Sequence, residues 1–316
     1  MIALEILLVS IPSVFFLSLL FEGIDRKIHA RMQRRIGPPI IQPFYDFIKL
    51  LFKENIVPET AARSIFNAAP SLAAASSIVG AAIPLANLIA KDSIIGDLIL
   101  VMYLLTMSSI MVVIGGSSSG NPYGAVGSSR KIMMLIGYEI PLLVSVVSLS
   151  IKAGPSLTHY SIILSQIESG KCFAYAYPSS AIAALTFLLC VSAAVGVVPF
   201  DIPEAKTEII HGPLIEYSGP HLALLKLAKS LTNFSLSLLA FTLFFYFPAI
   251  SELSIVFGEM AALGICLLGS LAVMFLTVTL PRTVFARLKI GQAFKTYWFF
   301  PLPMAIISLI LSVLGW

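Results

Sequence analysis

Residues 132–151 read IMMLIGYEIPLLVSVVSLSI, a stretch in which Glu139 is the only charged side chain. A helix of about 20 mostly apolar residues covers the ~30 Å hydrocarbon core of a bilayer. Charged residues enclose the stretch, with Arg130 and Lys131 before it and Lys152 after it. The stretch therefore predicts a membrane-spanning helix that carries one ionisable group.

Seven further stretches share this length and apolar character. Together the predicted spans are 2–21, 67–90, 94–115, 132–151, 180–199, 230–249, 254–280 and 298–315. Hydrophobic residues make up 58% of the 316 residues and charged residues 11%, whereas soluble domains carry about 25% charged residues. Because backbone polar groups must be paired inside lipid, we expect an all-α membrane protein. The predicted architecture is a single domain over residues 1–316, a bundle of about eight transmembrane helices.

Lysine and arginine fall almost entirely into alternate loops. Of these 20 residues, 17 lie in the regions that follow odd-numbered spans, and Lys91, Lys152 and Lys171 lie on the other side. The positive-inside rule then places both termini outside and the basic loops in the cytoplasm. No cleavable signal or targeting peptide is evident before the first span. We therefore expect a multi-pass protein of a prokaryotic cell (plasma) membrane.

The first cytoplasmic loop contains IQPFYDFIKLLFKE at residues 41–54, which is too short to span a bilayer. An apolar helical face is formed by Phe44, Phe47, Ile48, Leu51 and Phe52, with Asp46, Lys49 and Lys53 opposite. This pattern predicts an amphipathic helix that lies in the membrane interface. Farther along, GGSSSGNPYGAVGSSR at 115–130 predicts a flexible glycine–serine loop, either a contact for a docked partner or a tolerant connector.

The motifs of soluble enzymes are missing from the sequence. It has no phosphate-binding glycine loop, dinucleotide fingerprint or nucleophile elbow. The three cysteines lack metal-ligand spacing and are interpreted as small apolar core residues: Cys172, Cys190 and Cys266. None of the scattered histidines is predicted to be a buried metal ligand. We therefore expect no cofactor in this chain and no bond-making chemistry by the chain alone.

Carboxylates are the candidates for chemistry. Asp201, Glu204 and Glu208 lie in PFDIPEAKTEII, at spacings that predict one helical face with Pro203 in its first turn. Crowded, partly buried acids raise each other's pKa and exchange protons near neutral pH. The alternative is a solvated acidic face that Lys206 and the helix N-terminus neutralise.

Glu139 is the second candidate, because an ionisable group inside a span is expensive and usually functional. The alternative is that Glu139 sits at the cytoplasmic water boundary, since Arg130 and Lys131 come only two turns earlier. Glu22 and Asp25 are weaker candidates, with Arg26 and Lys27 alongside to neutralise them.

Four segments carry a resemblance to a known family. In order, they are DRKIHARMQRRIGPP (25–39), QPFYDFIKLLFKE (42–54), GYEIPL (137–142) and PFDIPEAKTEIIHGPLIEYSGP (199–220). Together they resemble the quinone-site membrane subunit of respiratory complex I and its homologues in membrane-bound nickel–iron hydrogenases. The hydrogenase branch is favoured because only Pro39, Ile40 and Ile41 separate Gly37-Pro38 from Gln42-Pro43. The AKTEI and NPYGAVGSSR segments also look like the hydrogenase form.

The resemblance implies roles for matching residues. A proton-path or coupling role would fall to the acids Glu139, Asp201, Glu204, Glu208 and Glu216. Docking of redox partners would fall to Arg26, Arg34 and Arg35. The implied partners are nickel–iron hydrogenase-like large and small subunits, an iron–sulfur subunit and antiporter-like membrane subunits. The nickel–iron centre and iron–sulfur clusters would lie in those partners.

The resulting hypothesis is a non-catalytic anchor and coupling subunit of a complex I-related membrane-bound hydrogenase, which links redox chemistry to proton or sodium translocation. A sulfur-reducing relative and a complex I-type quinone reductase are alternatives within the same architecture. A stand-alone transporter is disfavoured, because we find no internal repeat or matching pair of broken helices.

Overall fold

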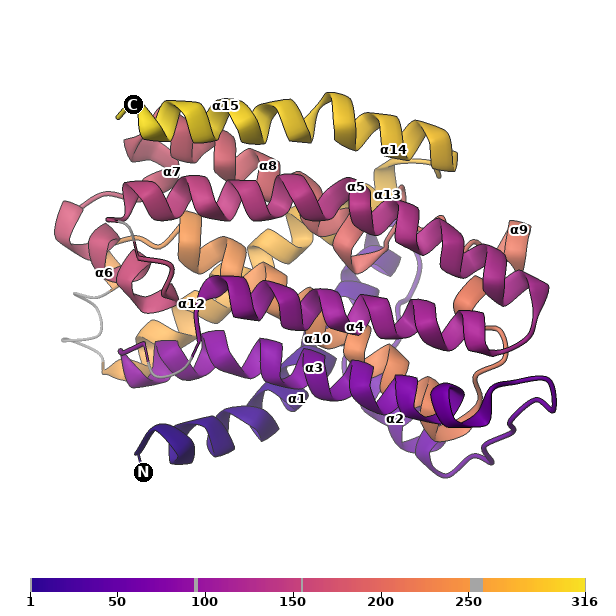
Figure 1. The fold of residues 1–316 in the computed structure, drawn as a ribbon. Helices are drawn as coiled ribbons and strands as arrows, with labels where there is room; N and C mark the ends of the chain where they lie inside the picture. Colours follow the sequence, from indigo (N-terminus) through magenta and orange to yellow (C-terminus); the bar gives the residue numbers. More distant parts are fainter. Residues whose placement is uncertain (1, 94–95, 155, 251–257, 316) are drawn as a thin grey trace.

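Helices make up the regular secondary structure of this protein in the ranges that the computed structural model describes, residues 2–93, 96–154, 156–250 and 258–315. No strand occurs in these ranges. The long helices run side by side along one direction (Figure 1). The predicted all-α architecture is confirmed.

Eight helical segments of the described residues are long and apolar enough to cross a membrane, as predicted. Five are the single helices α3 (Arg63–Ala90), α4 (Leu98–Ser118), α5 (Pro122–Lys152), α8 (Pro178–Val195) and α10 (Gly219–Phe244). The first span is α1 (Ile2–Met32). The seventh combines α12 (Glu259–Met274), a π-helical turn (Phe275–Thr279) and α13 (Leu280–Val284). The last combines α14 (Ile290–Phe299) and α15 (Pro301–Val313).

Several boundaries differ from the prediction. Helix α10 begins at Gly219 rather than residue 230, so Lys226 and Lys229 lie within the span and not in a loop. The final span breaks at Phe300 because Pro301 disfavours a helical conformation in the residue before it. Residues 254–257 of the predicted seventh span lie outside the described ranges.

Helix α10 is the most enclosed of the spans, and it packs against α1, α3, α8 and α12. Small hydroxyl side chains on α10 allow this close packing. Ser235, for example, donates a hydrogen bond to the Gly80 carbonyl of α3. The bundle is therefore assembled around α10.

The short helices mark the two ends of the bundle. Both termini lie at the end that carries α6 (His159–Ser169) and α7 (Phe173–Ala176) (Figure 1). Helices α2 (Gln42–Leu51) and α9 (Lys206–Ile209) lie toward the opposite end. Termini at one end fit an even number of spans, and the side of the membrane they face stays a prediction.

The predicted amphipathic helix forms as α2. Its Phe44 and Phe47 rings pack against Phe16 and Phe15 of α1, with centroids 6.0 and 5.3 Å apart. Phe52, just past its end, is 88% exposed. The helix is confirmed, and its place in the membrane interface stays a prediction.

The predicted flexible loop at 115–130 is wrong. Helix α4 continues to Ser118 and α5 begins at Pro122. The glycines there serve close packing. A Cβ on Gly116 or Gly127 would come within 2.6 Å of the Pro213 ring, which belongs to the 3₁₀ turn Gly212–Leu214.

Candidate functional site

The segment between α8 and α10 does not form the predicted acidic helix. Helix α8 ends at Val195, where Gly196 takes a left-handed conformation with φ of 66°. Residues 201–205 are non-helical, and of the three predicted acids only Glu208 lies in a helix, the short α9. The predicted single helical face for the three acids is therefore wrong, and Pro203 lies in a turn. Prolines interrupt helical hydrogen bonding and restrict the preceding residue, so this segment follows an irregular path.

Each of the first two acids instead has its own cation. Asp201 Oδ2 accepts a hydrogen bond from Arg287 Nη2 at 2.9 Å. Glu204 Oε2 accepts one from Lys229 Nζ of α10 at 2.7 Å. Lys229 also donates to the Gly196 carbonyl at 3.1 Å, which ties α10 to the end of α8.

Glu208 and Glu216 find their partners near the beginning of α5. Arg130 Nη1 at the start of α5 donates to Glu208 Oε2 at 2.5 Å. Asn121, which precedes α5, donates through Nδ2 to Glu216 Oε1. These two acids fasten the irregular segment to the α4–α5 corner and do not line the cavities described next.

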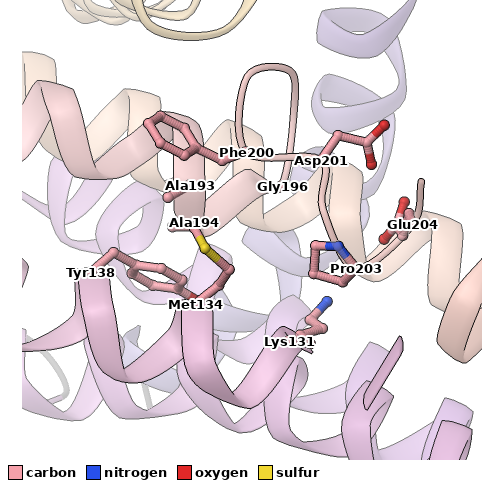
Figure 2. Close-up of a pocket in the computed structure, with 10 residues that line it drawn as sticks. All are labelled: Lys131, Met134, Tyr138, Ala193, Ala194, Gly196, Phe200, Asp201, Pro203 and Glu204. Carbon is pink, nitrogen blue, oxygen red and sulfur yellow. The ribbon is translucent and has the colours of Figure 1, made fainter. Parts of the chain in front are cut away.

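A small cavity opens beside Asp201 and Glu204. Figure 2 shows both carboxylates on the irregular segment and Lys131, Met134 and Tyr138 on α5 across from it. The lining residues are Lys131, Met134, Tyr138, Ala193, Ala194, Gly196, Phe200, Asp201, Pro203 and Glu204. We call this space the loop cavity.

The two acids of the loop cavity differ in their electrostatics. Burial raises the pKa of Asp201, and the Glu204 carboxylate adds to that, while Lys229 and Arg287 oppose it. Burial also disfavours ionised Glu204, but the cations Lys229 and Lys131 outweigh it and hold the pKa of Glu204 below its usual range. Glu204 is thus a stable anion and Asp201 the more readily protonated group.

Glu139 lies in a neighbouring cavity between α4 and α5. Its Oε1 accepts a hydrogen bond from Thr106 Oγ1 of α4 at 2.5 Å. The lining residues are Met102, Leu105, Thr106, Ser109, Tyr138, Glu139, Leu142, Ala194, Thr232 and Leu236. We call this space the span cavity. Tyr138 and Ala194 line both cavities, so Tyr138 stands between the acids of the loop and Glu139 of the span.

Glu22 is neutralised by Arg26, as predicted, whereas Asp25 is paired with a cation of another helix. Glu22 accepts hydrogen bonds from Arg26 and from Ser230 of α10. The buried Asp25 is bound by Thr279 Oγ1 at 2.6 Å and by Arg282 Nη1 at 3.1 Å. Both contacts come from the seventh span, so Asp25 joins α1 to the π-helical turn.

The predicted docking arginines divide into two kinds. Arg26 is half-buried and pairs with Glu22 and, at 2.7 Å, with Asp46 of α2. Arg34 and Arg35 lie just beyond α1 and are exposed, with Arg34 in a left-handed conformation (φ 57°). Arg26 therefore holds α2 on α1, and only Arg34 and Arg35 present charge on the surface.

Four side chains at or beside the cavities were missed by the sequence reasoning: Lys131, Tyr138, Thr106 and Lys229. It counted Lys131 and Lys229 only as loop charges. Lys131 and Tyr138 are seven residues apart on α5, and Tyr138 directly precedes Glu139. That helical spacing was a usable signal for Lys131. Thr106 and Lys229 gave no such signal, because their partners belong to other segments.

The cysteines lie in the core, as interpreted from the sequence. Cys172, Cys190 and Cys266 are buried and unlinked. Over the described ranges, no group of three or more His, Cys, Asp or Glu side chains is arranged to hold a metal ion.

Comparisons with known proteins place this geometry in a wider group. The sequence model of the family described as NADH dehydrogenase matches residues 4–313. NADH-quinone oxidoreductase subunit 8 of Rhodothermus marinus is 31% identical over 92% of this chain and 90% of its own length. Hydrogenase-4 component C of Escherichia coli (strain K12) is 34% identical over 84% of this chain and 80% of its own length.

One solved structure shares nearly the whole fold. A chain of the membrane-bound sulfane sulfur reductase, an archaeal respiratory membrane complex, superposes with a TM-score of 0.86 at 29% identity. The match covers 98% of this chain and 99% of that chain.

Proposed function

This chain belongs to the NADH dehydrogenase family, as a membrane subunit of the complex I-related type, and from this premise we propose that it couples redox chemistry in docked partners to ion translocation. The proposed path runs from Asp201 in the loop cavity, past Tyr138, to Glu139 in the span cavity. Glu208 and Glu216 lie outside both cavities and support the path by fastening the loop.

The observation that carries this proposal is the shared wall of the two cavities. Tyr138 and Ala194 line both, so one side chain separates the acids of the loop from the acid of the span. Buried ionisable groups in a membrane are costly and mark ion or proton paths. Glu139 has Thr106 as a hydrogen-bond partner and no bonded cation among the described residues, which suits a group that gains and loses a proton.

The test is Glu139→Gln in the assembled complex. Gln keeps the size and the contact with Thr106 but cannot carry the proton, so we expect redox turnover to persist and ion translocation to be lost. Both rates are measured in the same vesicles. Glu168→Gln, an exposed acid on α6, is the control and should translocate normally. Normal ion translocation by Glu139→Gln would contradict the proposal.

The redox partners would dock at the end of the bundle that carries Arg34 and Arg35. Their exposed guanidinium groups suit an acidic partner surface, and guanidinium is the cation best shaped for carboxylates. We take this surface, close to α2 and the irregular segment, as the face for nickel–iron hydrogenase-like and iron–sulfur subunits.

The hydrogenase branch is our first candidate for the complex, supported by the short first loop and the 34% identity to hydrogenase-4 component C. A sulfur-reducing complex is the second, favoured by the 98% coverage of the sulfane sulfur reductase chain. Purification of the tagged chain with its partners in mild detergent separates them. Nickel with hydrogen evolution supports the first, and sulfur reduction without nickel supports the second.

A further inference from the structure

We propose that Lys131 is a proton-exchanging residue between the loop cavity and Glu139. This inference rests on the proposed function, and it assigns one more residue to the same path. Lys131 and Tyr138 line the loop cavity from one face of α5, and Glu139 follows about two helical turns after Lys131. Figure 2 shows the Lys131 ammonium pointing from α5 toward Pro203, on the side of the carboxylates.

Lys131 differs from its neighbours in having no bonded partner. The adjacent Arg130 pairs with Glu208, and Lys229 takes both Glu204 and the Gly196 carbonyl. For Lys131, the described part of the chain supplies no ion pair and no hydrogen bond, only the nearby charges of Glu204, which is attractive, and of Lys229, which is repulsive. A half-buried amine that faces a cavity without a fixed partner is free to gain and lose a proton.

The charge of the cluster favours exchange at this residue. With every group ionised, Lys131, Lys229 and Arg287 face Asp201 and Glu204, three cations against two anions. Loss of one proton makes the cluster neutral. Arg287 does not deprotonate in proteins, and Lys229 is held by two acceptors. The proton that leaves is therefore the one on Lys131.

The other charged groups near the cluster leave this balance unchanged. Arg282, which faces Lys229, is itself paired with Asp25. His211 is exposed and acts on Glu204 only through its charge. Tyr138, the remaining titratable group on the wall, lies between Lys131 and the span cavity.

The step itself is a simple transfer. The neutral Lys131 amine takes a proton from the Asp201 carboxyl group across the loop cavity, so that an N–H bond forms as the carboxyl O–H bond breaks and a carboxylate remains. The resulting ammonium then gives a proton to the Tyr138 hydroxyl, which releases its own proton to the Glu139 carboxylate on the other side of the wall. The reverse sequence carries protons the other way.

The experiment compares Lys131→Arg, Lys131→His and Lys131→Met in the assembled complex, and it scores only preparations that keep redox turnover. Arg keeps a positive charge but cannot deprotonate, whereas His can exchange a proton. We expect Arg and Met to lower translocation at least about tenfold. We expect His to restore it with the pH profile shifted to lower pH, since imidazole titrates near 6.5 and amine near 10.4. Lys295→Met, an exposed lysine of α14, is the matched control.

If Lys131 acted only through its positive charge or its packing, Lys131→Arg would translocate better than Lys131→His. Translocation by Lys131→Arg at the normal rate would overturn the proposal, and so would normal translocation by Lys131→Met or loss in the His variant as well. Glu139→Gln is measured beside them. If Glu139→Gln translocates normally, the proposed function fails. If Glu139→Gln loses translocation and Lys131→Arg translocates normally, the proposed function stands and the assignment of Lys131 fails.

Discussion

Single residues in this protein acquire their properties from partners on other helices. Asp201 and Glu204 are three positions apart, yet their pKa values shift in opposite directions. Burial raises the pKa of Asp201, whereas at Glu204 the effect of burial is outweighed by the cations Lys229 and Lys131 together. The same dependence on partners appears at the opposite end of the bundle. There the buried His159 Nε2 lies 2.8 Å from Thr242 Oγ1 of α10.

Thr242 is the hydrogen-bond partner of this buried histidine. Thr242 Oγ1 also lies 2.9 Å from the Leu238 carbonyl; when the hydroxyl donates to that carbonyl, it accepts a hydrogen bond from a protonated His159 Nε2. Among the described residues His159 Nδ1 has no partner. Burial lowers the pKa of His159 to about 4, so the side chain is neutral in the folded protein at neutral pH.

Stability should therefore depend on pH through His159. The unfolded chain binds this proton near pH 6.5 and the folded chain only near pH 4. The contribution is full above about pH 6.5 and is lost as the pH falls toward 4. We expect the melting temperature of the detergent-solubilised protein to decrease over this window and the decrease to be smaller in His159→Gln. His211→Gln, at an exposed histidine, should follow the wild type, and an unchanged slope in His159→Gln would contradict the assignment.

At the scale of elements, glycine positions decide how the irregular segment packs. The 3₁₀ turn at Gly212–Leu214 sits on α4 and α5 at Gly116 and Gly127. Tyr217 extends this contact: its ring stacks on Phe66 of α3 at 4.2 Å and its hydroxyl donates to the Phe66 carbonyl. The segment that carries Asp201 and Glu204 is thus held by three spans.

Adding a methyl group at this contact should weaken the whole arrangement. In Gly116→Ala the new Cβ would lie 2.6 Å from Pro213 Cβ and 2.7 Å from its Cα, which demands a backbone shift. We expect a loss of about 1–3 kcal/mol in unfolding free energy, the usual cost of overpacking. Thermal unfolding in detergent measures it. Gly264→Ala, inside α12 with open space around it, is the control and should be neutral or slightly stabilising. Equal melting of the two variants would show that the turn does not pack on Gly116.

For the whole molecule, the arrangement of its ends determines which side each loop faces. Both termini and α6 lie at one end, and the first loop and α9 lie toward the other (Figure 1). The positive-inside rule predicts that the basic loops are cytoplasmic, in which case the terminal end would face outside.

Cysteine labelling tests this orientation. The native cysteines are buried, so an impermeant maleimide should report introduced ones. We expect Glu168→Cys to react in right-side-out vesicles and Lys53→Cys only in inside-out vesicles, both positions being exposed. The reversed pattern would place the acidic segment outside and would be incompatible with cytoplasmic docking of redox partners.

The sequence by itself determined the number of spans, the amphipathic helix and the family resemblance, and it singled out Glu139 as a candidate. Each depends on local properties, since hydrophobic length and helical periodicity are read within one segment. It failed at Asp201, Glu204 and Glu208, where prolines replaced the expected helix with an irregular path.

The tertiary structure alone decided which charges meet. Lys229 reaches Glu204 across 25 residues of sequence, and Arg287 reaches Asp201 across 86. Such pairs follow from how helices pack, because a cation is stabilised by whichever carboxylate the fold places beside it. The spacing along α5 indicates that Lys131 shares a face with Tyr138, but only the packing of the other segments left it beside the loop cavity without a bonded partner.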